Sequence, residues 1–373
     1  MTLPRESSTR RAARPPPSGA ARPGAAIAWD VLDALLAWFA VNRRDLPWRE
    51  PANRADPYRV LVAEVMLQQT QVTTVVPYFR RWLERFPDLQ TLAAADEDAV
   101  LRSWQGLGYY RRARHLQRAA RLSIERFGGA LPRGRRELES LPGVGRYTAA
   151  AVAALAFATP GVAVDANVRR LASRLHGWPL PPPDAEVERA LLARWGEPGP
   201  QRAADVAEAL IELGALVCTP AAPACRCCPL ASDCLAAAGG RPERFPRAAP
   251  RRRPPQRRRF ALVAVDEGRV WLRRREPGGL LGGLWGFPQA DVAPEGGRRF
   301  EAVRHAYSHF RLELVPVLVP CDHPALAARG DAGPQPLEAL DRLPLSAVDL
   351  RVLERLAEQG LVPARASPRS RPP

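Results

Sequence analysis

Five of the six cysteines in this 373-residue chain lie between positions 218 and 234. Four of them have the spacing C-x6-C-x2-C-x5-C, namely Cys218, Cys225, Cys228 and Cys234. Four thiolates in so short a loop are typical of one compact metal centre. Because the paired C-x2-C knuckles of structural zinc are absent, we favour a [4Fe–4S] cluster over zinc. Cys227 offers a competing register, and a disulfide framework is the least favoured interpretation.

A second motif, Leu141-Pro-Gly-Val-Gly-Arg-Tyr-Thr-Ala-Ala150, predicts a tight turn between two helices. The proline cannot extend the polar helix expected over 135–140, and Gly143 and Gly145 permit a turn into an alanine-rich helix over 146–158. Backbone N–H groups at such a helix start favour a phosphate. We interpret the motif as a helix-hairpin-helix that contacts a nucleic-acid backbone. An ordinary glycine turn is the alternative on spacing alone.

The charge of the chain favours a polyanionic partner. The formal net charge is +16 and the sequence pI is about 10.9. Nucleic acid is therefore the first partner to consider, and an anionic membrane surface the second. All 55 basic residues are arginine, so no side-chain amine is available to form a Schiff base. The apolar stretch 25–41 is too short to span a bilayer, so we expect a cytoplasmic protein with no membrane partner.

Hydrophobic spacing divides the chain into two domains joined by a linker. Residues 27–217 have helical periodicity almost throughout, which predicts an all-α domain that ends at the cysteine loop 218–234. Residues 235–258 are rich in arginine and proline and predict a linker. The period then changes, and 259–363 predict an α+β domain. We expect disorder in the remaining segments, 1–26 and 364–373.

Within the second domain we expect three strands and one helix. Residues 260–265 and 269–272 flank Asp266-Glu-Gly268 and predict a β-hairpin. Residues 312–319 predict a further strand, and 346–359 a closing helix.

Taken together, these motifs resemble the DNA glycosylases of the endonuclease III superfamily. The helix-hairpin-helix, an aspartate 20 residues past Gly145 and the four-cysteine loop carry the resemblance. Three further segments resemble the adenine glycosylase branch, the MutY family: Glu64-Val-Met-Leu-Gln-Gln-Thr-Gln71, Gly106-Leu-Gly-Tyr-Tyr110 and Val164-Asp-Ala-Asn-Val168. The resemblance covers about residues 30 to 320. It implies a helix-hairpin-helix glycosylase domain with an iron–sulfur loop, followed by a Nudix-like domain.

The resemblance implies roles for four catalytic residues. Cleavage of an N-glycosidic bond needs a proton on the leaving base and a negative charge near the developing sugar cation. Glu64 would protonate adenine at N7, and Asp165 would stabilise the sugar cation or capture it transiently. Asn167 would help to hold the attacking water. The alternatives are a surface helix residue for Glu64 and a helix cap for Asp165.

Tyr147 distinguishes this chain from relatives that also cut the DNA strand. In those enzymes the corresponding position is a lysine whose amine attacks the sugar. A phenol can hydrogen-bond Asp165 but cannot form an imine, so we expect a monofunctional glycosylase that uses water. Many relatives carry lysine at the position of Arg169, so a borohydride-trapped complex through that side chain is not expected here.

The resemblance also implies the residues that hold the substrate. Gln69 and Tyr109 would form a wedge that fills the gap left by the extruded base. Trp48, Arg49 and Glu208 would surround the extruded adenine, with Glu208 accepting hydrogen bonds from its amine. Core packing is the alternative for Trp48 and Tyr109.

The C-terminal domain resembles a Nudix fold, to which Gly283-Leu-Trp-Gly-Phe-Pro288 corresponds. A run of the form R-E-x-x-E-E that would hold magnesium is missing, so we expect recognition and no pyrophosphatase activity. The loop Tyr307, Ser308 and His309 would recognise 8-oxoguanine opposite adenine. Phenylalanine is more usual at the first of these positions, and tyrosine keeps the ring while adding a hydroxyl.

The resulting hypothesis is a monomeric, nucleoid-associated enzyme that removes adenine mispaired with 8-oxoguanine or guanine in duplex DNA. Two rivals are a glycosylase/lyase for oxidised pyrimidines and a non-catalytic iron–sulfur protein that binds mismatches. Tyr147, the absence of lysine and the added domain oppose the first rival. The second would follow if Glu64 and Asp165 were only structural.

Overall fold

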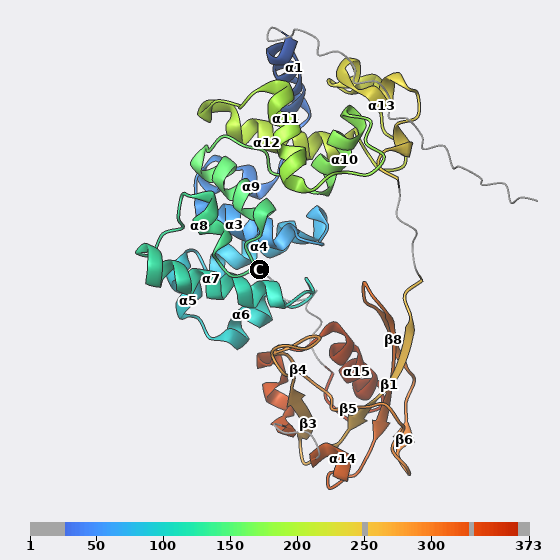
Figure 1. The fold of residues 1–373 in the computed structure, drawn as a ribbon. Coiled ribbons are helices and arrows are strands. Elements are labelled where there is room, and N and C mark those ends of the chain that lie inside the picture. Colours follow the sequence, from blue (N-terminus) through green and yellow to red (C-terminus); the bar gives the residue numbers. More distant parts are fainter. Residues whose placement is uncertain (1–26, 248–252, 328–331, 365–373) are drawn as a thin grey trace, which may run out of the picture.

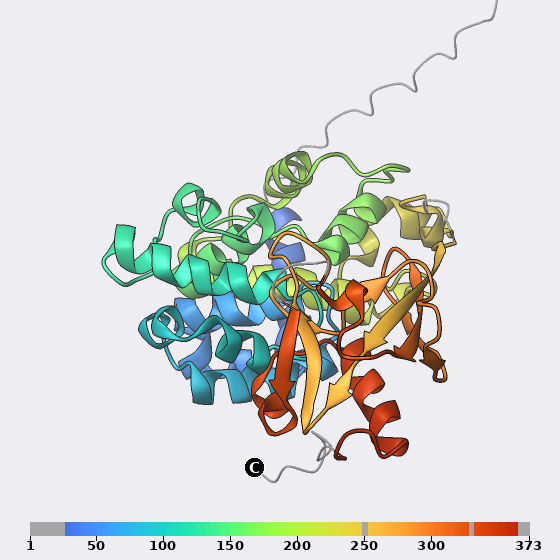
Figure 2. The ribbon, with the colours of Figure 1, turned by 90° about the horizontal axis from the view of Figure 1, so that it is seen from below.

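The computed structural model describes residues 27–247, 253–327 and 332–364, so most of both expected disordered termini lies outside the described residues. The chain forms a helical domain followed by a domain built on two β-sheets (Figure 1). Seen from below, the strands of the second domain lie in front of the helices of the first (Figure 2). Among the described residues no helix has the length and apolar character needed to cross a membrane.

The helical domain confirms the all-α prediction. Its helices are α1 (Ile27–Asn42), η1 (Pro47–Arg49), α2 (Pro51–Arg54), α3 (Pro57–Leu67), α4 (Val72–Arg85), α5 (Leu89–Ala94), α6 (Glu97–Ser103), α7 (Arg111–Phe127), α8 (Arg135–Glu139), α9 (Arg146–Phe157), α10 (Ala166–Leu175), α11 (Asp184–Trp195) and α12 (Pro200–Leu216). Several begin at an aspartate whose side chain accepts a hydrogen bond from the first turn, as Asp56 does at α3 and Asp96 at α6.

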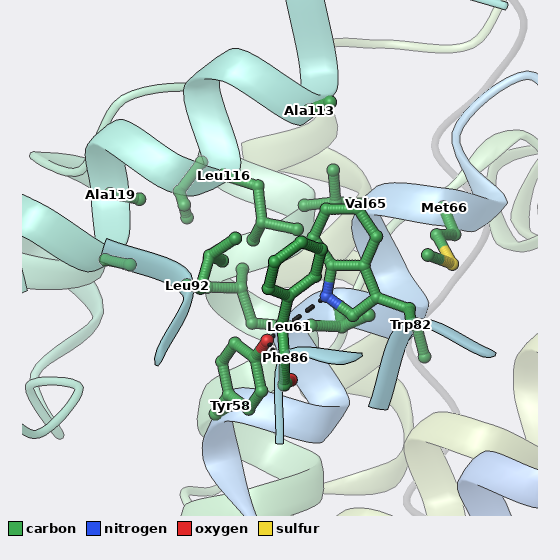
Figure 3. Packing of buried hydrophobic residues seen from close by; sticks show 14 of the residues in the cluster. Tyr58, Leu61, Val65, Met66, Trp82, Phe86, Leu92, Ala113, Leu116 and Ala119 are labelled. Carbon is green, nitrogen blue, oxygen red and sulfur yellow. Dashed lines mark hydrogen bonds between the residues drawn. The ribbon is translucent and has the colours of Figure 1, made fainter. Parts of the chain in front are cut away.

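Two hydrophobic cores divide this domain into halves. The first lies around α3, α4 and α7, where Trp82 is fully buried among other hydrophobic side chains (Figure 3). Trp104, at the end of α6, is buried in the same core. The second lies among α1, α10, α11 and α12. Helix α9 packs against α3 of the first half and α12 of the second. Side chains on α9 therefore lie where the two halves meet, and α9 begins at the helix-hairpin-helix motif.

The segment expected to be a linker is partly folded against the helical domain. It contains α13 (Leu235–Ala238) and η4 (Pro242–Arg244). The buried guanidinium of Arg174 donates hydrogen bonds from Nε to the carbonyls of Pro242 and Phe245, both at 3.0 Å. The cysteine loop before it contains η2 (Cys225–Cys227) and η3 (Ala231–Asp233). The strand that opens the second domain begins at Gln256, inside the expected linker.

In its described residues the second domain contains nine strands and one long helix. Its strands are β1 (Gln256–Val263), β2 (Val265–Asp266), β3 (Arg269–Arg274), β4 (Trp285–Gly286), β5 (Gln289–Ala290), β6 (Arg298–Arg299), β7 (Val303–Ala306), β8 (Arg311–Leu318) and β9 (Ala332–Pro336). Its helical elements are α14 (Pro324–Ala327), η5 (Leu337–Arg342) and α15 (Ala347–Glu358). Strand β8 and helix α15 confirm the strand and helix predicted at 312–319 and 346–359.

The predicted hairpin is largely wrong. Of the first predicted strand, only its last residue, Val265, lies in a strand that pairs with β3: β2 pairs at Val265 with Val270 and at Asp266 with Arg269. Strand β1 instead lies in the other sheet, parallel to β8 along its whole length and antiparallel to β5. The chain changes sheets near Ala264, directly after the three residues of β1 that are buried beside β8, Ala261, Leu262 and Val263.

The loop between β3 and β4 fixes the second domain to the first. Leu284 is fully buried in the first core of the helical domain. Arg274 forms a 2.7 Å ion pair with Asp98 on α6, and Arg114 on α7 donates a 2.7 Å hydrogen bond to the carbonyl of Pro277. Apolar burial and polar contacts together hold both domains in one arrangement.

Candidate active site

Glu64 and Tyr147 lie where the two halves of the helical domain meet. Glu64, on α3, has only 6% of its surface exposed, so the alternative of a surface helix residue is wrong. Its Oε2 atom has no hydrogen-bond partner among the described residues. Burial raises the pKa of Glu64 to about 7, although a hydrogen bond with Tyr147 opposes the rise. The nearby charge of Asp165 raises the pKa further. A carboxyl in this state can hold a proton near neutral pH and deliver it.

Tyr147 lies on the first turn of α9, beside both carboxyl groups. Burial raises the pKa of its phenol well above the usual value, and the charges of Glu64 and Asp165 act in the same direction. The hydroxyl therefore keeps its proton and serves as a hydrogen-bond donor to a carboxylate. A phenol has no amine, so it cannot form an imine with the sugar.

Asp165 caps the N-terminus of α10, so the alternative role predicted for this residue, a helix cap, is confirmed. Its Oδ1 accepts a 2.7 Å hydrogen bond from the backbone N–H of Val168, and its Oδ2 accepts one of 2.8 Å from Nδ2 of Asn167. Burial raises the pKa of Asp165, and these hydrogen bonds oppose the rise. Two donors and the positive end of a helix favour the ionised form. The geometry thus keeps a negative charge beside a carboxyl that holds a proton.

Asn167 is held in turn by Arg170 of its own helix and by the close approach of α12. Its Oδ1 accepts a 2.9 Å hydrogen bond from Arg170, which also donates to the carbonyls of Gly214 and Cys218, each at 2.8 Å. A Cβ atom on Gly214 would lie 2.6 Å from Cβ of Asn167. Only glycine lets α12 approach α10 so closely.

A network of buried ion pairs adjoins the two carboxyl groups. Arg49 forms 3.0 Å ion pairs with Glu208 and with Glu212. Glu212 is completely buried and also receives hydrogen bonds from both the backbone and the guanidinium of Arg44. Although burial opposes it, these arginines lower the pKa of Glu212 to about 2. Glu208 lies close enough to Glu64 for its charge to raise the pKa of that carboxyl.

Glu212 was missed from the sequence. It lies four residues after Glu208 on α12, so both side chains lie on one face of the helix. That spacing is the signal that could have found it. Trp48 of the same predicted pocket packs its ring edge-on against Phe79, with the centroids 5.7 Å apart, at the border of the first core.

The two predicted wedge residues share an unusual backbone conformation. Gln69 has φ of 58° and Tyr109 has φ of 47°, in the left-handed region that side chains other than glycine rarely adopt. Both side chains are exposed, Tyr109 to 46%, so core packing is wrong for Tyr109. Strained and exposed residues are typical of a functional surface.

The wedge meets the predicted 8-oxoguanine loop across the domain boundary. The hydroxyl of Tyr109 donates a 2.8 Å hydrogen bond to Oγ of Ser308, whose Oγ also lies 3.0 Å from Nδ1 of His309. Ser308 and His309 are exposed. Tyr307 is half-buried, and its ring stacks on Phe310 with the centroids 4.7 Å apart. Two segments about 200 residues apart in sequence are therefore side by side.

The hairpin motif presents its backbone at an open surface. Gly143 has φ of +79°, and a Cβ atom there would lie 2.6 Å from Cβ of His115, so glycine is required on two grounds. At Gly145, which precedes α9, an added Cβ atom would meet nothing within 4 Å. Both glycines line a groove of about 470 Å³ that Arg111 and His115 of α7 also line.

The four spaced cysteines line one cavity beneath α10. Cys218, Cys225, Cys228 and Cys234 all border it, together with Arg174, whose guanidinium donates a 3.3 Å hydrogen bond to Sγ of Cys218. Cys227 is exposed and lies outside this lining. In the described part of the chain no three metal-ligating side chains approach closely enough to hold a single ion. Four thiols around a shared, largely apolar cavity suit a metal centre held by thiolates.

Comparison with known proteins agrees with this geometry. Residues 62–197 match the HhH-GPD superfamily of base excision DNA repair proteins, and residues 259–355 match the NUDIX domain. An adenine DNA glycosylase of Mycolicibacterium smegmatis is 42% identical over 212 residues, which are 56% of this chain and 70% of the relative. This chain belongs to the adenine DNA glycosylase family. The resemblance to the MutY branch is thereby confirmed.

Longer relatives extend beyond the matched region. An adenine DNA glycosylase of Rattus norvegicus is 37% identical over 331 residues, which are 75% of this chain and 64% of the relative. The chain thus spans less than two thirds of that relative. Among solved structures, a thermostable thymine-DNA glycosylase matches with a TM-score of 0.51 and 29% identity, over 57% of this chain and 97% of that protein. Its fold is the helical fold described above.

Proposed function

We propose that this chain is a monofunctional DNA glycosylase that removes adenine mispaired with 8-oxoguanine or guanine in duplex DNA. One observation carries the proposal. Glu64 is a buried carboxyl that can hold a proton near neutral pH. It lies near Asp165, a carboxylate that accepts two hydrogen bonds, and the phenol of Tyr147 lies beside both groups. This set of groups can break a glycosidic bond, and it contains no amine to form an imine.

The reaction proceeds by departure of a protonated base. Glu64 gives its proton to N7 of adenine, and the bond from N9 to C1′ breaks with its electron pair moving to the base. The sugar carries the positive charge, which the carboxylate of Asp165 stabilises. A water held at Asn167 adds to C1′ and gives a proton to the Glu64 carboxylate, which restores the acid, so the products are free adenine and an abasic site. Tyr147 keeps both carboxyl groups oriented.

Recognition of the mispair is assigned to two surfaces. Gln69 and Tyr109 enter the stack when adenine leaves it, and Arg49 and Glu208 contact the extruded base. Ser308, placed by its hydrogen bond with Tyr109, contacts 8-oxoguanine in the opposite strand, with Tyr307 and His309 beside it. The N–H groups at Gly143 and Gly145 bind a phosphate and set the position of the duplex. All of these proposed contacts with the duplex come from one chain, so a second copy is not needed and the protein would act on chromosomal DNA as a monomer.

The cysteine loop is assigned to a [4Fe–4S] cluster held by Cys218, Cys225, Cys228 and Cys234. When bound, such a cluster would cross-link the loop and secure it against α10. Arg174 adds a hydrogen bond to one ligand sulfur, which suits a thiolate.

A pair of neighbouring cysteines tests this assignment. We expect Cys228→Ser to lose most of the bound iron and the visible absorbance of the cluster, because it removes a thiol that lines the cavity. Cys227→Ser is the matched control, one residue away and exposed, and is expected to keep both. Iron analysis and absorbance spectra of the purified variants decide the matter. Equal iron loss in the two variants would show that the choice of Cys228 over Cys227 as a ligand is wrong.

The pH dependence of the reaction follows from the acid. Glu64 works in its protonated form, and its pKa is about 7 in the folded protein. The single-turnover rate constant should therefore fall as pH rises above about 7, by up to about tenfold per pH unit. In Glu64→Gln this alkaline limb should disappear, since glutamine does not titrate. A rate that increases through neutral pH would contradict the assignment of Glu64 as the acid.

An end-labelled duplex with one adenine opposite 8-oxoguanine tests the function directly. After incubation with the protein, half of the sample is treated with hot alkali. Strand breaks in the treated half alone would support base removal without lyase activity. Breaks without alkali would favour the glycosylase/lyase, and tight binding with no breaks in either half would favour the mismatch-binding protein.

A further inference from the structure

Arg112, the second residue of α7, is buried between two segments that carry the wedge residues. Only 9% of its surface is exposed. Its NH1 atom donates 2.9 Å hydrogen bonds to the carbonyls of Val65 and Met66, and a third to the carbonyl of Gln68. These are carbonyls at the C-terminal end of α3, where the helix carrying Glu64 gives way to Gln69.

The other nitrogen of the same guanidinium reaches the second wedge loop. NH2 donates 3.2 Å hydrogen bonds to the carbonyls of Leu107 and Gly108, and a 3.1 Å hydrogen bond to Oγ1 of Thr70. One planar group thus joins the residues on both sides of Gln69 to the two residues before Tyr109. The guanidinium carbon also lies 5.6 Å from the centre of the Tyr109 ring.

Arg112 is held without an opposite charge. No carboxylate forms an ion pair with it within the described ranges, and burial lowers its pKa to about 10. The negative end of the α3 dipole and five carbonyl oxygens replace an anion. This arrangement requires a planar fork of donors. Lysine has three donors on one atom and cannot reach both loops at once.

We propose that Arg112 is a positioning residue for base extrusion, which holds Gln69 and Tyr109 in the strained conformations that let them act as one wedge. The proposal rests on the proposed function, because it assigns a role within that reaction. Gln69 and Tyr109 both have a left-handed backbone conformation, and such a conformation persists in residues other than glycine only where the surrounding structure imposes it. Arg112 hydrogen-bonds the residues on both sides of Gln69, through the carbonyl of Gln68 and the hydroxyl of Thr70. It also hydrogen-bonds the two carbonyls directly before Tyr109.

Single-turnover kinetics of Arg112→Lys test the proposal. With adenine opposite 8-oxoguanine, we expect base release to slow by about a hundredfold, the effect of a misplaced positioning group. Binding to a duplex with an abasic analogue opposite 8-oxoguanine should change less than about twofold, because no base has to leave the stack. The matched control is Arg121→Lys, an exposed residue of α7 whose guanidinium donates to carbonyls of another segment.

A double-mutant cycle separates a role through the wedge from general support of the fold. In a chain with Gln69→Ala and Tyr109→Ala, adding Arg112→Lys should slow base release by less than about twofold, since the wedge it positions is gone. If Arg112→Lys still slowed base release by about a hundredfold in the chain without the wedge side chains, the proposal would be overturned. An unchanged rate in Arg112→Lys alone would also overturn it.

Thr70→Val provides a milder variant in case Arg112→Lys does not fold. It removes a single acceptor of Arg112 and is expected to slow extrusion by about threefold to tenfold, again only when the wedge is intact. An unchanged rate in Thr70→Val would overturn the proposal. If the unaltered chain releases no adenine, the proposed function itself fails, an outcome distinct from an active chain that is insensitive to Arg112.

Discussion

Replacing Glu64 with glutamine is expected to slow adenine release by about a thousandfold or more, the upper part of the range for a general acid. The buried carboxyl lies beside Tyr147 and near Asp165, and with a pKa of about 7 it can carry a proton near neutral pH. Glutamine has nearly the same shape but no proton that it can give to N7. The single-turnover rate constant on adenine opposite 8-oxoguanine is the quantity to measure.

Binding provides the control for this variant. Glu64 is buried and one of its oxygens already lacks a hydrogen-bond partner, so an amide is accommodated without breaking an ion pair. Affinity for the mispaired duplex should therefore stay within about threefold of the unaltered chain, since phosphate contacts dominate it. An unchanged rate would remove Glu64 from the chemistry and favour a protein that only binds mismatches. Loss of both rate and affinity would show a structural role instead.

Local patterns predicted the helices well, because each helix has its signals within its own sequence. The alanine-rich helix expected over 146–158 is α9, Arg146–Phe157. The strands were harder to place. Residues 260–265 were expected to pair with 269–272, and β1 instead pairs with β8, about fifty residues later. Alternation of apolar residues shows that a segment is a strand, and it does not show which strand lies beside it.

The candidate site shows the same division between local and distant information. The spacing of the cysteines separated Cys228 from Cys227, and the structure places only Cys228 on the cavity. Arg112 was not identified, because it is one of many arginines on α7 and its partners come from α3 and the loop after α6. The left-handed backbone of Gln69 and Tyr109 was also beyond prediction, since both residue types usually avoid it.

Arginine without lysine has different consequences on the surface and in the interior. At the surface, arginine and lysine side chains carry the same charge, so a net charge of +16 would attract DNA to a similar degree with either residue. In the interior the planar fork matters. Arg49 spans Glu208 and Glu212, and Arg174 joins the cysteine loop to the segment that follows it. These contacts fix backbone and side chains that a single ammonium group could not reach together.

Replacing Asp165 with asparagine is expected to slow adenine release by about a hundredfold to a thousandfold, the usual effect of removing one electrostatic contact with a transition state. Asparagine keeps an oxygen that can accept the hydrogen bond from Val168, so the cap of α10 is retained. What is lost is the negative charge beside the sugar cation. In the unaltered chain Nδ2 of Asn167 donates to Oδ2 of Asp165. If the amide nitrogen of the new asparagine takes the position of Oδ2, this hydrogen bond is lost, because both nitrogens are donors.

A second N-cap separates the charge of Asp165 from its role as a cap. Asp96 begins α6, which packs in the first core while α10 packs in the second, and it accepts a 3.2 Å hydrogen bond from the N–H of Ala99. Asp96→Asn should leave the single-turnover rate unchanged and match Asp165→Asn in thermal stability within a few degrees. If both variants kept the full rate, the sugar cation would need another counter-charge. In the proposed mechanism Glu64 acts in its protonated form, so Asp165, held by two hydrogen-bond donors, is the carboxylate that would supply this charge.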